Sequence, residues 1–249
     1  MLRIITDFDG PIIDVSERYY RVYQICLEKT RNREQTVREL TKAEFWELKR
    51  ERVPETQIGI ISGLDKAQAQ TFSQMRRQTV HTQPYFQYDC LAWGAVNTML
   101  KIKQMGIDLA VMTMRRVREL NYALNRYDLD NFFPENRRYC LSNNYIKTHD
   151  VEDKPLFLSN NYIKTHDVED KPLLMARALN ELPPAYDTWM IGDTEADIVA
   201  AKRHGIKVIA VECGIRDRAQ LESQLPDLIV QDFSCAVKLV LENSLQQVG

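Results

Sequence analysis

Short apolar runs alternate with amphipathic stretches along most of the chain. The runs cover residues 2–6, 107–112, 138–142, 188–191, 207–211 and 228–230, and each has the length of a buried strand. Apolar residues recur at helical spacing over residues 90–104, 117–127, 173–182, 195–204 and 234–243. Strands that alternate with helices build parallel βαβ units with right-handed crossovers. We therefore expect an α/β core with a Rossmann-like parallel sheet, whose ligand site lies beyond the carboxyl ends of the strands.

The pattern changes between residues 15 and 84. Apolar residues recur at helical spacing from Tyr19 to Leu27, and residues 41–51 and 65–82 are helix-like and rich in polar residues. No convincing strand interrupts them. We expect a small helical cap domain at residues 15–84, inserted into a core that consists of residues 1–14 and 85–249.

A stretch of sixteen residues, LSNNYIKTHDVEDKPL, occurs twice without change, at residues 141–156 and 158–173. It offers two lysines, Lys154 and Lys171, each followed by proline. Only Lys171 precedes a helix-like segment, and proline is favoured at the first helical position, so Lys171 is the lysine that we expect at the strand ends. Residues 139–141 and 156–158 are both apolar enough to supply the neighbouring strand. We interpret the repeat as an in-frame duplication without a function of its own, carried as a surface loop.

Composition and charge exclude several classes of protein. The 249 residues, 44% of them hydrophobic and 27% charged, suit a globular core with an accessory domain. A net charge of −2 gives no long-range attraction to nucleic acid or to an anionic membrane. The N-terminus does not resemble a signal peptide, and no apolar run approaches the roughly 18 residues of a membrane span. Five dispersed cysteines indicate reduced thiols, so we expect a cytoplasmic protein, either a monomer or a homodimer.

Carboxylates follow two of the predicted strands. Asp7 and Asp9 come directly after the first strand, and Asp193 and Asp197 follow the strand at residues 188–191. Repulsion within such a group must be offset by a cation, and oxygen ligands in this number suit Mg²⁺. A lone acid pair in a loop is more often solvated. Here, however, a hydroxyl at Thr113 and a lysine also lie at the ends or starts of βα elements, and we consider a chance arrangement improbable.

These motifs resemble those of the haloacid dehalogenase superfamily, in particular its phosphatases with a helical cap after the first strand, of the phosphoglycolate phosphatase and beta-phosphoglucomutase type. Residues 7–14, DFDGPIID, resemble the first motif, D-x-D-G-x-x-x-D, and Thr113 resembles the second. Lys171 resembles the third, and residues 192–197, GDTEAD, resemble the fourth, G-D-x-x-x-D. Two departures are Pro11, where Thr or Val is usual, and Met114-Arg115, where many relatives have Asn-Lys.

The resemblance implies roles for the catalytic residues. Asp7 would attack phosphorus and form an aspartyl-phosphate, which divides hydrolysis into two easier steps. Asp9 would protonate the leaving oxygen and then deprotonate the attacking water. Thr113 and Lys171 would bind phosphate oxygens.

The resemblance also implies a magnesium site and contacts to a phosphorylated small molecule. Mg²⁺ would be bound by Asp7, Asp193 and the main-chain carbonyl of Asp9, with Asp197 orienting the metal's water or Lys171. Further candidates for substrate contacts are the residues Gly10, Met114, Arg115, Lys49 and Arg52. For the last two, a solvated helix face with i,i+4 pairs is the simpler interpretation.

Several alternatives are considered. Dehalogenases of the superfamily lack the carboxylate that Asp9 provides, because a halide needs no protonation, so phosphate ester hydrolysis is favoured. A sugar phosphomutase would use the same four motifs, and a phosphonatase would need a cap lysine that no context singles out. The alternative from another class is a non-catalytic protein on this scaffold that binds phosphate or a partner. Such a protein would have no reason to keep Asp9. No G-x-G-x-x-G follows the first strand, which disfavours a dinucleotide-binding oxidoreductase.

Overall fold

A computed structural model describes residues 1–145 and 166–246 of the chain. These residues form two compact units. The core unit comprises residues 1–14, 91–145 and 166–246, and the inserted unit comprises Val15–Cys90. The inserted unit therefore extends beyond residue 84, where the sequence pattern placed the end of the cap.

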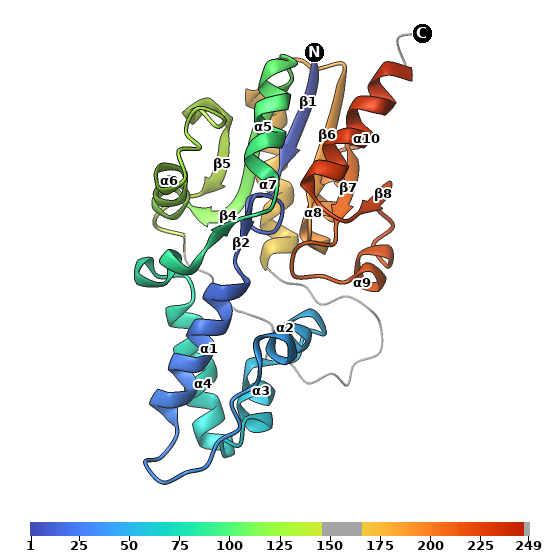
Figure 1. Ribbon diagram of the computed structural model, residues 1–249. Helices are drawn as coiled ribbons and strands as arrows, with labels where there is room; N and C mark the ends of the chain where they lie inside the picture. Colours follow the sequence, from blue (N-terminus) through green and yellow to red (C-terminus); the bar gives the residue numbers. More distant parts are fainter. Residues whose placement is uncertain (146–165, 247–249) are drawn as a thin grey trace. The chain divides into compact units, whose positions relative to one another are not determined.

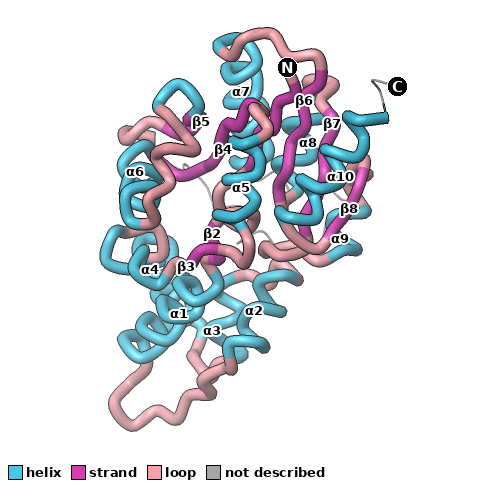
Figure 2. The backbone as a smooth tube through the Cα atoms, turned by 45° about the horizontal axis from the view of Figure 1, so that its top comes forward, coloured by secondary structure: helices cyan, strands magenta, loops and turns pink. Residues whose placement is uncertain are grey.

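The core unit contains a parallel sheet of six strands (Figures 1 and 2). Its spatial order is β5-β4-β1-β6-β7-β8. The strands are β1 (Leu2–Thr6), β4 (Asp108–Arg116), β5 (Arg138–Leu141), β6 (Asp187–Gly192), β7 (Lys207–Val211) and β8 (Leu228–Val230). Parallel pairing brings all carboxyl ends to one edge, and the predicted α/β fold is confirmed.

Helices cover both faces of this sheet. They are α5 (Ala95–Gln104), α6 (Val117–Arg126), α7 (His166–Glu181), α8 (Glu195–Arg203), α9 (Arg218–Glu222) and α10 (Phe233–Gln246), with the 3₁₀ turn η2 (Glu135–Arg137) before β5. Helices α5 and α10 lie side by side on one face, and α7 and α8 lie side by side on the other (Figure 2). Strand residues such as Ile5, Met190 and Val208 pack with Met175 and Ile198 from the helices into a continuous apolar core. This core fixes the strand ends that carry the polar residues.

Three predicted boundaries were wrong. Cys90 and Leu91 do not begin a helix but form β3 (Cys90–Leu91), which pairs with β2 (Ile13–Asp14), and α5 starts only at Ala95. Gly94, with φ of 74°, has a left-handed backbone that a continuous helix does not allow. Strand β4 does not end near Met112 but continues to Arg116. Helix α7 begins at His166, so Pro172 lies inside the helix and not at its first position.

Between residues 16 and 88 the inserted unit consists of helices and the loops that join them. It contains α1 (Ser16–Thr30), α2 (Lys42–Arg50), α3 (Glu55–Ile61), α4 (Lys66–Thr79) and the 3₁₀ helix η1 (Gln83–Tyr88). Thr41 and Asp65 form capping boxes at the starts of α2 and α4 and so satisfy main-chain donors there. Tyr23, Phe45 and Phe72 pack against one another in its own apolar core.

A buried ion cluster fixes Lys49 within the inserted unit. Its Nζ lies 2.8 Å from Glu55 Oε1, and Arg76 Nε lies 2.6 Å from Glu55 Oε2. All three residues are more than nine-tenths buried. Lys49 is therefore no part of a solvated helix face, and its ammonium is already engaged by a carboxylate of its own unit, which favours a structural role over a substrate contact.

Among the residues that the structure describes, parts of both copies of the repeat belong to the core unit. Strand β5 ends at Leu141, so the first copy borders this strand, and Lys171 of the second copy lies in α7. The Tyr145 hydroxyl of the first copy donates to the Asp170 carboxylate of the second. The alternative strand at residues 156–158 and the second lysine, Lys154, lie outside the described residues.

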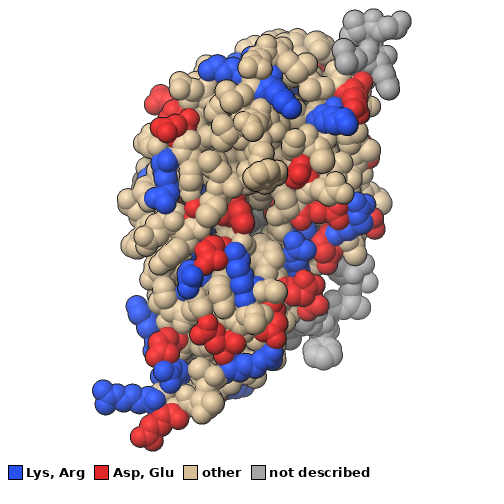
Figure 3. Space-filling model, in the orientation of Figure 1, with Lys and Arg blue, Asp and Glu red and all other residues tan. Residues whose placement is uncertain are grey.

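Charged side chains of both signs are interspersed on the face shown in Figure 3. This mixed surface agrees with the net charge of −2. In the two described stretches, 1–145 and 166–246, no helix is long and apolar enough to cross a membrane.

Candidate active site

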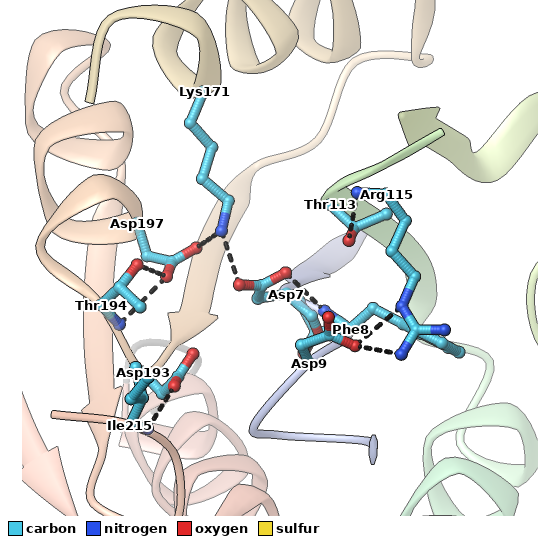
Figure 4. Close-up of polar contacts among 11 residues, drawn as sticks. Asp7, Phe8, Asp9, Thr113, Arg115, Lys171, Asp193, Thr194, Asp197 and Ile215 are labelled. Carbon is cyan, nitrogen blue, oxygen red and sulfur yellow. Dashed lines mark hydrogen bonds and ion pairs between the residues drawn. The ribbon is translucent and has the colours of Figure 1, made fainter. Parts of the chain in front are cut away.

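The site is built around Asp7, which directly follows β1 at the carboxyl edge of the sheet. Its main-chain N–H donates to Ile191 O in the neighbouring strand at 2.8 Å, which continues the ladder between β1 and β6 up to this residue. The Phe8 N–H donates to Asp7 Oδ1 at 2.6 Å. The Asp7 carboxylate is therefore held in one orientation, with Oδ2 turned toward Lys171 (Figure 4).

Lys171 connects the two acidic motifs. Its Nζ lies 2.6 Å from Asp7 Oδ2 and 2.6 Å from Asp197 Oδ1. The other oxygen of Asp197, Oδ2, accepts from the Thr194 hydroxyl at 2.7 Å and from the Thr194 N–H at 3.1 Å, which forms a capping box at the start of α8. Because both oxygens of Asp197 have donors, this residue is placed to orient Lys171.

Asp193 faces the same point from the end of β6. One oxygen each from Asp7, Asp193 and Asp197 lie within 4.8 Å of one another, and all three residues are buried. The Ile215 N–H, from the loop after β7, donates to Asp193 Oδ2 at 2.8 Å. A Cβ at Gly10 would lie 2.5 Å from Asp193 Cγ, and one at Gly214 would lie 1.8 Å from Asp193 Oδ2, so only glycine leaves room for this carboxylate.

The electrostatics of this cluster fit a divalent cation. Burial raises the pKa of Asp7 well above its usual range, against the opposing Lys171 ammonium and with the help of Asp197 and Asp193. Burial and the Asp197 carboxylate raise the pKa of Asp193 to about 7. Burial alone would lower the pKa of Lys171, but the carboxylates of Asp197 and Asp7 outweigh it and raise the pKa. Three carboxylates with one ammonium leave excess negative charge, and hard oxygen ligands suit Mg²⁺.

Asp9 lies apart from this cluster. Its Oδ1 accepts from Arg115 Nε at 2.9 Å and from Arg115 Nη2 at 2.7 Å (Figure 4). The side chain therefore points to β4 and not to Asp193, which leaves its main-chain carbonyl as the group that could bind a metal. Thr113, also in β4, is buried, and its Oγ1 accepts from the Arg115 N–H at 3.2 Å.

The remaining predicted residues lie in different surroundings. Gly10, with φ of 92°, turns the chain directly after Asp9. Met114 packs against the apolar core of the sheet, so it is not among the groups at the acidic cluster. Lys49 is engaged by Glu55, as described above, and Arg52 is half-buried at the turn between α2 and α3 with φ of 59°.

Two features of the site were not predicted from the sequence. The loop after β7 reaches Asp193 through Gly214 and the Ile215 N–H. It follows a predicted strand, so the rule that ligands gather at carboxyl strand ends could have drawn attention to it. The pairing of Arg115 with Asp9 was also missed, because it depends on the course of β4 beyond Met112, where the register of β4 against β5 shifts.

Comparisons with known proteins agree with the fold. A family described as HAD-hydrolase-like matches residues 170–236, which include Lys171, Asp193 and Asp197. No curated protein sequence matches the chain.

Solved structures with the same fold cover nearly the whole chain. One from Clostridium difficile, provisionally named a phosphatase, has a TM-score of 0.69 at 15% identity and covers 96% of this chain and 97% of its own. A predicted phosphoglycolate phosphatase from Haemophilus somnus has a TM-score of 0.59 at 17% identity, with 95% and 96% covered. A structure from Thermotoga maritima, provisionally named a beta-phosphoglucomutase, has a TM-score of 0.59 at 19% identity, with 100% of both chains covered. The chain thus has the fold of the haloacid dehalogenase superfamily, and the resemblance that its motifs predicted is confirmed.

Proposed function

We propose that the protein is a Mg²⁺-dependent phosphatase that hydrolyses a small-molecule phosphate monoester through an aspartyl-phosphate on Asp7. The observation that carries the proposal is the presence of two carboxylates with different surroundings after β1. Asp7 is buried beside Lys171 and the acidic cluster, whereas the Asp9 side chain is 31% exposed and lies outside that cluster. A nucleophile and a separate acid–base group are what ester hydrolysis by covalent catalysis requires.

In the first step, an Asp7 carboxylate oxygen attacks phosphorus, and the bond between phosphorus and the ester oxygen breaks. Asp9 gives a proton to the departing oxygen, so the product leaves as an alcohol. Lys171 and the Thr113 hydroxyl donate to the transferred phosphoryl oxygens, and Asp197 keeps Lys171 oriented toward them.

In the second step, Asp9 takes a proton from a water molecule, whose oxygen attacks the phosphorus of the aspartyl-phosphate. The bond between phosphorus and the Asp7 oxygen breaks, which releases inorganic phosphate, restores the Asp7 carboxylate and leaves Asp9 protonated, as it was before the first step. Proton transfer of this kind contributes roughly 10²–10⁴-fold to the rate.

The carboxylates of Asp7 and Asp193 and the main-chain carbonyl of Asp9 are the groups that would bind Mg²⁺. When bound, the metal would offset negative charge on the transferred phosphoryl group.

The names of similar structures support a phosphoryl-transfer reaction. The phosphatase names of the Clostridium difficile and Haemophilus somnus proteins favour hydrolysis, and the Thermotoga maritima name favours a phosphomutase as the second candidate. In a phosphomutase, a sugar phosphate and not water would accept the phosphoryl group from Asp7. The inserted unit is the part to which we assign the choice of substrate, with Arg52 as a candidate contact.

A screen of phosphorylated metabolites tests the proposal. We expect Mg²⁺-dependent release of inorganic phosphate from at least one of them. This release should be lost in the variant Asp7→Asn and when a chelator is added to the wild type. Asp128→Asn is the matched control, because Asp128 is exposed and has a left-handed backbone that asparagine accepts. Release that does not need Asp7 would contradict the covalent route, and transfer to a second sugar phosphate without release would identify a phosphomutase.

A further inference from the structure

Arg115 differs from an arginine placed to bind substrate, because its guanidinium is already directed at a catalytic carboxylate. Both Nε, at 2.9 Å, and Nη2, at 2.7 Å, donate to the same oxygen of Asp9, Oδ1. Arg115 is 4% exposed, whereas the side chain of Asp9 is 31% exposed. The arginine is therefore the fixed partner, and the carboxylate is the one that reaches solvent.

Two further contacts hold Arg115, one through its guanidinium and one through its main chain. Its Cζ lies 5.2 Å from the centre of the Phe8 ring, which is fully buried. Stacking on an aromatic ring holds the plane of a guanidinium in a way that the flexible ammonium of lysine cannot reproduce. The Arg115 N–H donates to Thr113 Oγ1 at 3.2 Å, and the shift of register near the end of β4 re-aims the side chains there.

The main chain around Asp9 is fixed independently of Arg115. The N–H groups of Ile12 and Ile13 both donate to Phe8 O, and the Gly10 N–H donates to Ile13 O. What these bonds leave undetermined is the side-chain torsion of Asp9, which has three staggered positions. The two donors of Arg115 select one of them.

We infer that Arg115 is a positioning residue, which holds the Asp9 carboxylate in one orientation for the transfer of a proton to the leaving oxygen and from water. The inference rests on the function proposed above and deepens it. It assigns to Arg115 an effect on proton transfer and not on the binding of substrate. A misplaced acid–base group loses much of its effect, because proton transfer needs hydrogen-bond distance to the reacting oxygen.

Steady-state kinetics on two esters test the inference. The substrates are an alkyl phosphate, whose alkoxide must be protonated, and an activated aryl phosphate, whose phenolate leaves more easily. For Arg115→Met we expect kcat on the alkyl ester to fall by roughly 10–100-fold with KM changed by less than about threefold, and a smaller fall on the aryl ester. Arg115→Lys should recover part of the loss. Arg138→Met, which removes a core-unit arginine paired with Asp130, is the control and should leave kcat within about twofold.

The double variant with Asp9→Asn separates positioning from a general loss of structure. Asparagine keeps the acceptor oxygen for Arg115 but transfers no proton, so Arg115→Met should change kcat by less than about threefold in this background. Three results would each overturn the inference. One is a fall in kcat on adding Arg115→Met to Asp9→Asn that is as large as the fall in the wild type. The others are equal losses of kcat on both esters for Arg115→Met, and a raised KM with unchanged kcat.

A measurement without turnover tests the contact itself. The Arg115 Nε–H signal in a nitrogen-edited NMR spectrum, assigned by its loss in Arg115→Lys, should exchange slowly with water in the wild type and faster in Asp9→Ala. Equal exchange in both proteins would overturn the inference while leaving the proposed function untouched. If the wild type hydrolyses neither ester, the proposed function fails first, and the role of Arg115 in it fails with it.

Discussion

Replacement of Lys49 by methionine should destabilise the inserted unit by about 3 kcal/mol. The substitution removes one of the two cations that offset the buried Glu55 carboxylate, at Nζ–Oε1 2.8 Å, and leaves Arg76 at 2.6 Å. Breaking a buried ion pair costs roughly 3–5 kcal/mol, and the remaining arginine places the effect at the lower end.

The pKa of Glu55 shows how much the two cations together stabilise its carboxylate, which sets an upper bound for the share of Lys49. Burial alone would raise it, but Arg76 and Lys49 together lower the pKa of Glu55 from 4.5 to about 2. At about 1.4 kcal/mol per pKa unit, ionised Glu55 contributes about 3 kcal/mol to stability. Because the folded pKa is the lower one, this contribution is fully present above the unfolded value of 4.5 and is lost as the pH falls through about 2. Glu55→Gln should therefore flatten the decline of stability across this range.

Urea unfolding followed by tryptophan fluorescence measures the effect. Trp46 lies in α2, whereas Trp93 and Trp189 belong to the core unit, so the background Trp93→Phe/Trp189→Phe makes Trp46 the reporter of the inserted unit. Arg52→Met is the matched control, for which we expect a change below about 1 kcal/mol. If Lys49→Met destabilises the unit no more than Arg52→Met does, the cluster is not stabilising, and Lys49 returns to the candidates for substrate contact.

Three further predictions concern the core unit. Lys171→Met should abolish phosphate release, because it removes the ammonium that lies 2.6 Å from both Asp7 and Asp197. Lys154→Met, in the other copy of the repeat, should leave phosphate release unchanged. Inactivation by Lys154→Met alone would show that the wrong copy was chosen. Deletion of residues 146–162 leaves a single intact copy of the repeat and keeps both residues of the Tyr145–Asp170 hydrogen bond. The circular dichroism spectrum and the rate of phosphate release of this variant should therefore match those of the full chain. Failure of the variant to fold would show that the repeat is a structural part of the protein. Asp9→Asn should slow alkyl esters more than activated aryl esters in matched assays, and equal slowing would remove its role as the leaving-group acid.

The sheet and most of its helices could be predicted because buried strands and amphipathic helices impose different periods on the sequence. Strand β1 at Leu2–Thr6 and strand β7 at Lys207–Val211 have the predicted bounds. Cys90 and Leu91 were misassigned because two residues are too few to show alternation, and their strand exists only through pairing with Ile13 and Asp14, which are distant in sequence.

The candidate site was predictable where residue type and strand end coincide. Asp7 and Asp193 meet because the parallel strands β1 and β6 bring their carboxyl ends together, and Asp197 from α8 and Lys171 from α7 reach the same point. The partner of a charged side chain has no comparable signal in a single sequence. Lys49 appeared solvated because its neighbours in α2 are charged, although it is buried and paired with Glu55 from another helix.

The covalent intermediate is the most direct test of the proposed mechanism. The protein is mixed with Mg²⁺ and a substrate from the screen that carries a radiolabelled phosphoryl group, quenched in acid within one turnover, and digested. The account predicts label on the peptide that contains Asp7, released by mild base, and none in Asp7→Asn. Turnover without label on that peptide, or with label on another residue, would contradict it.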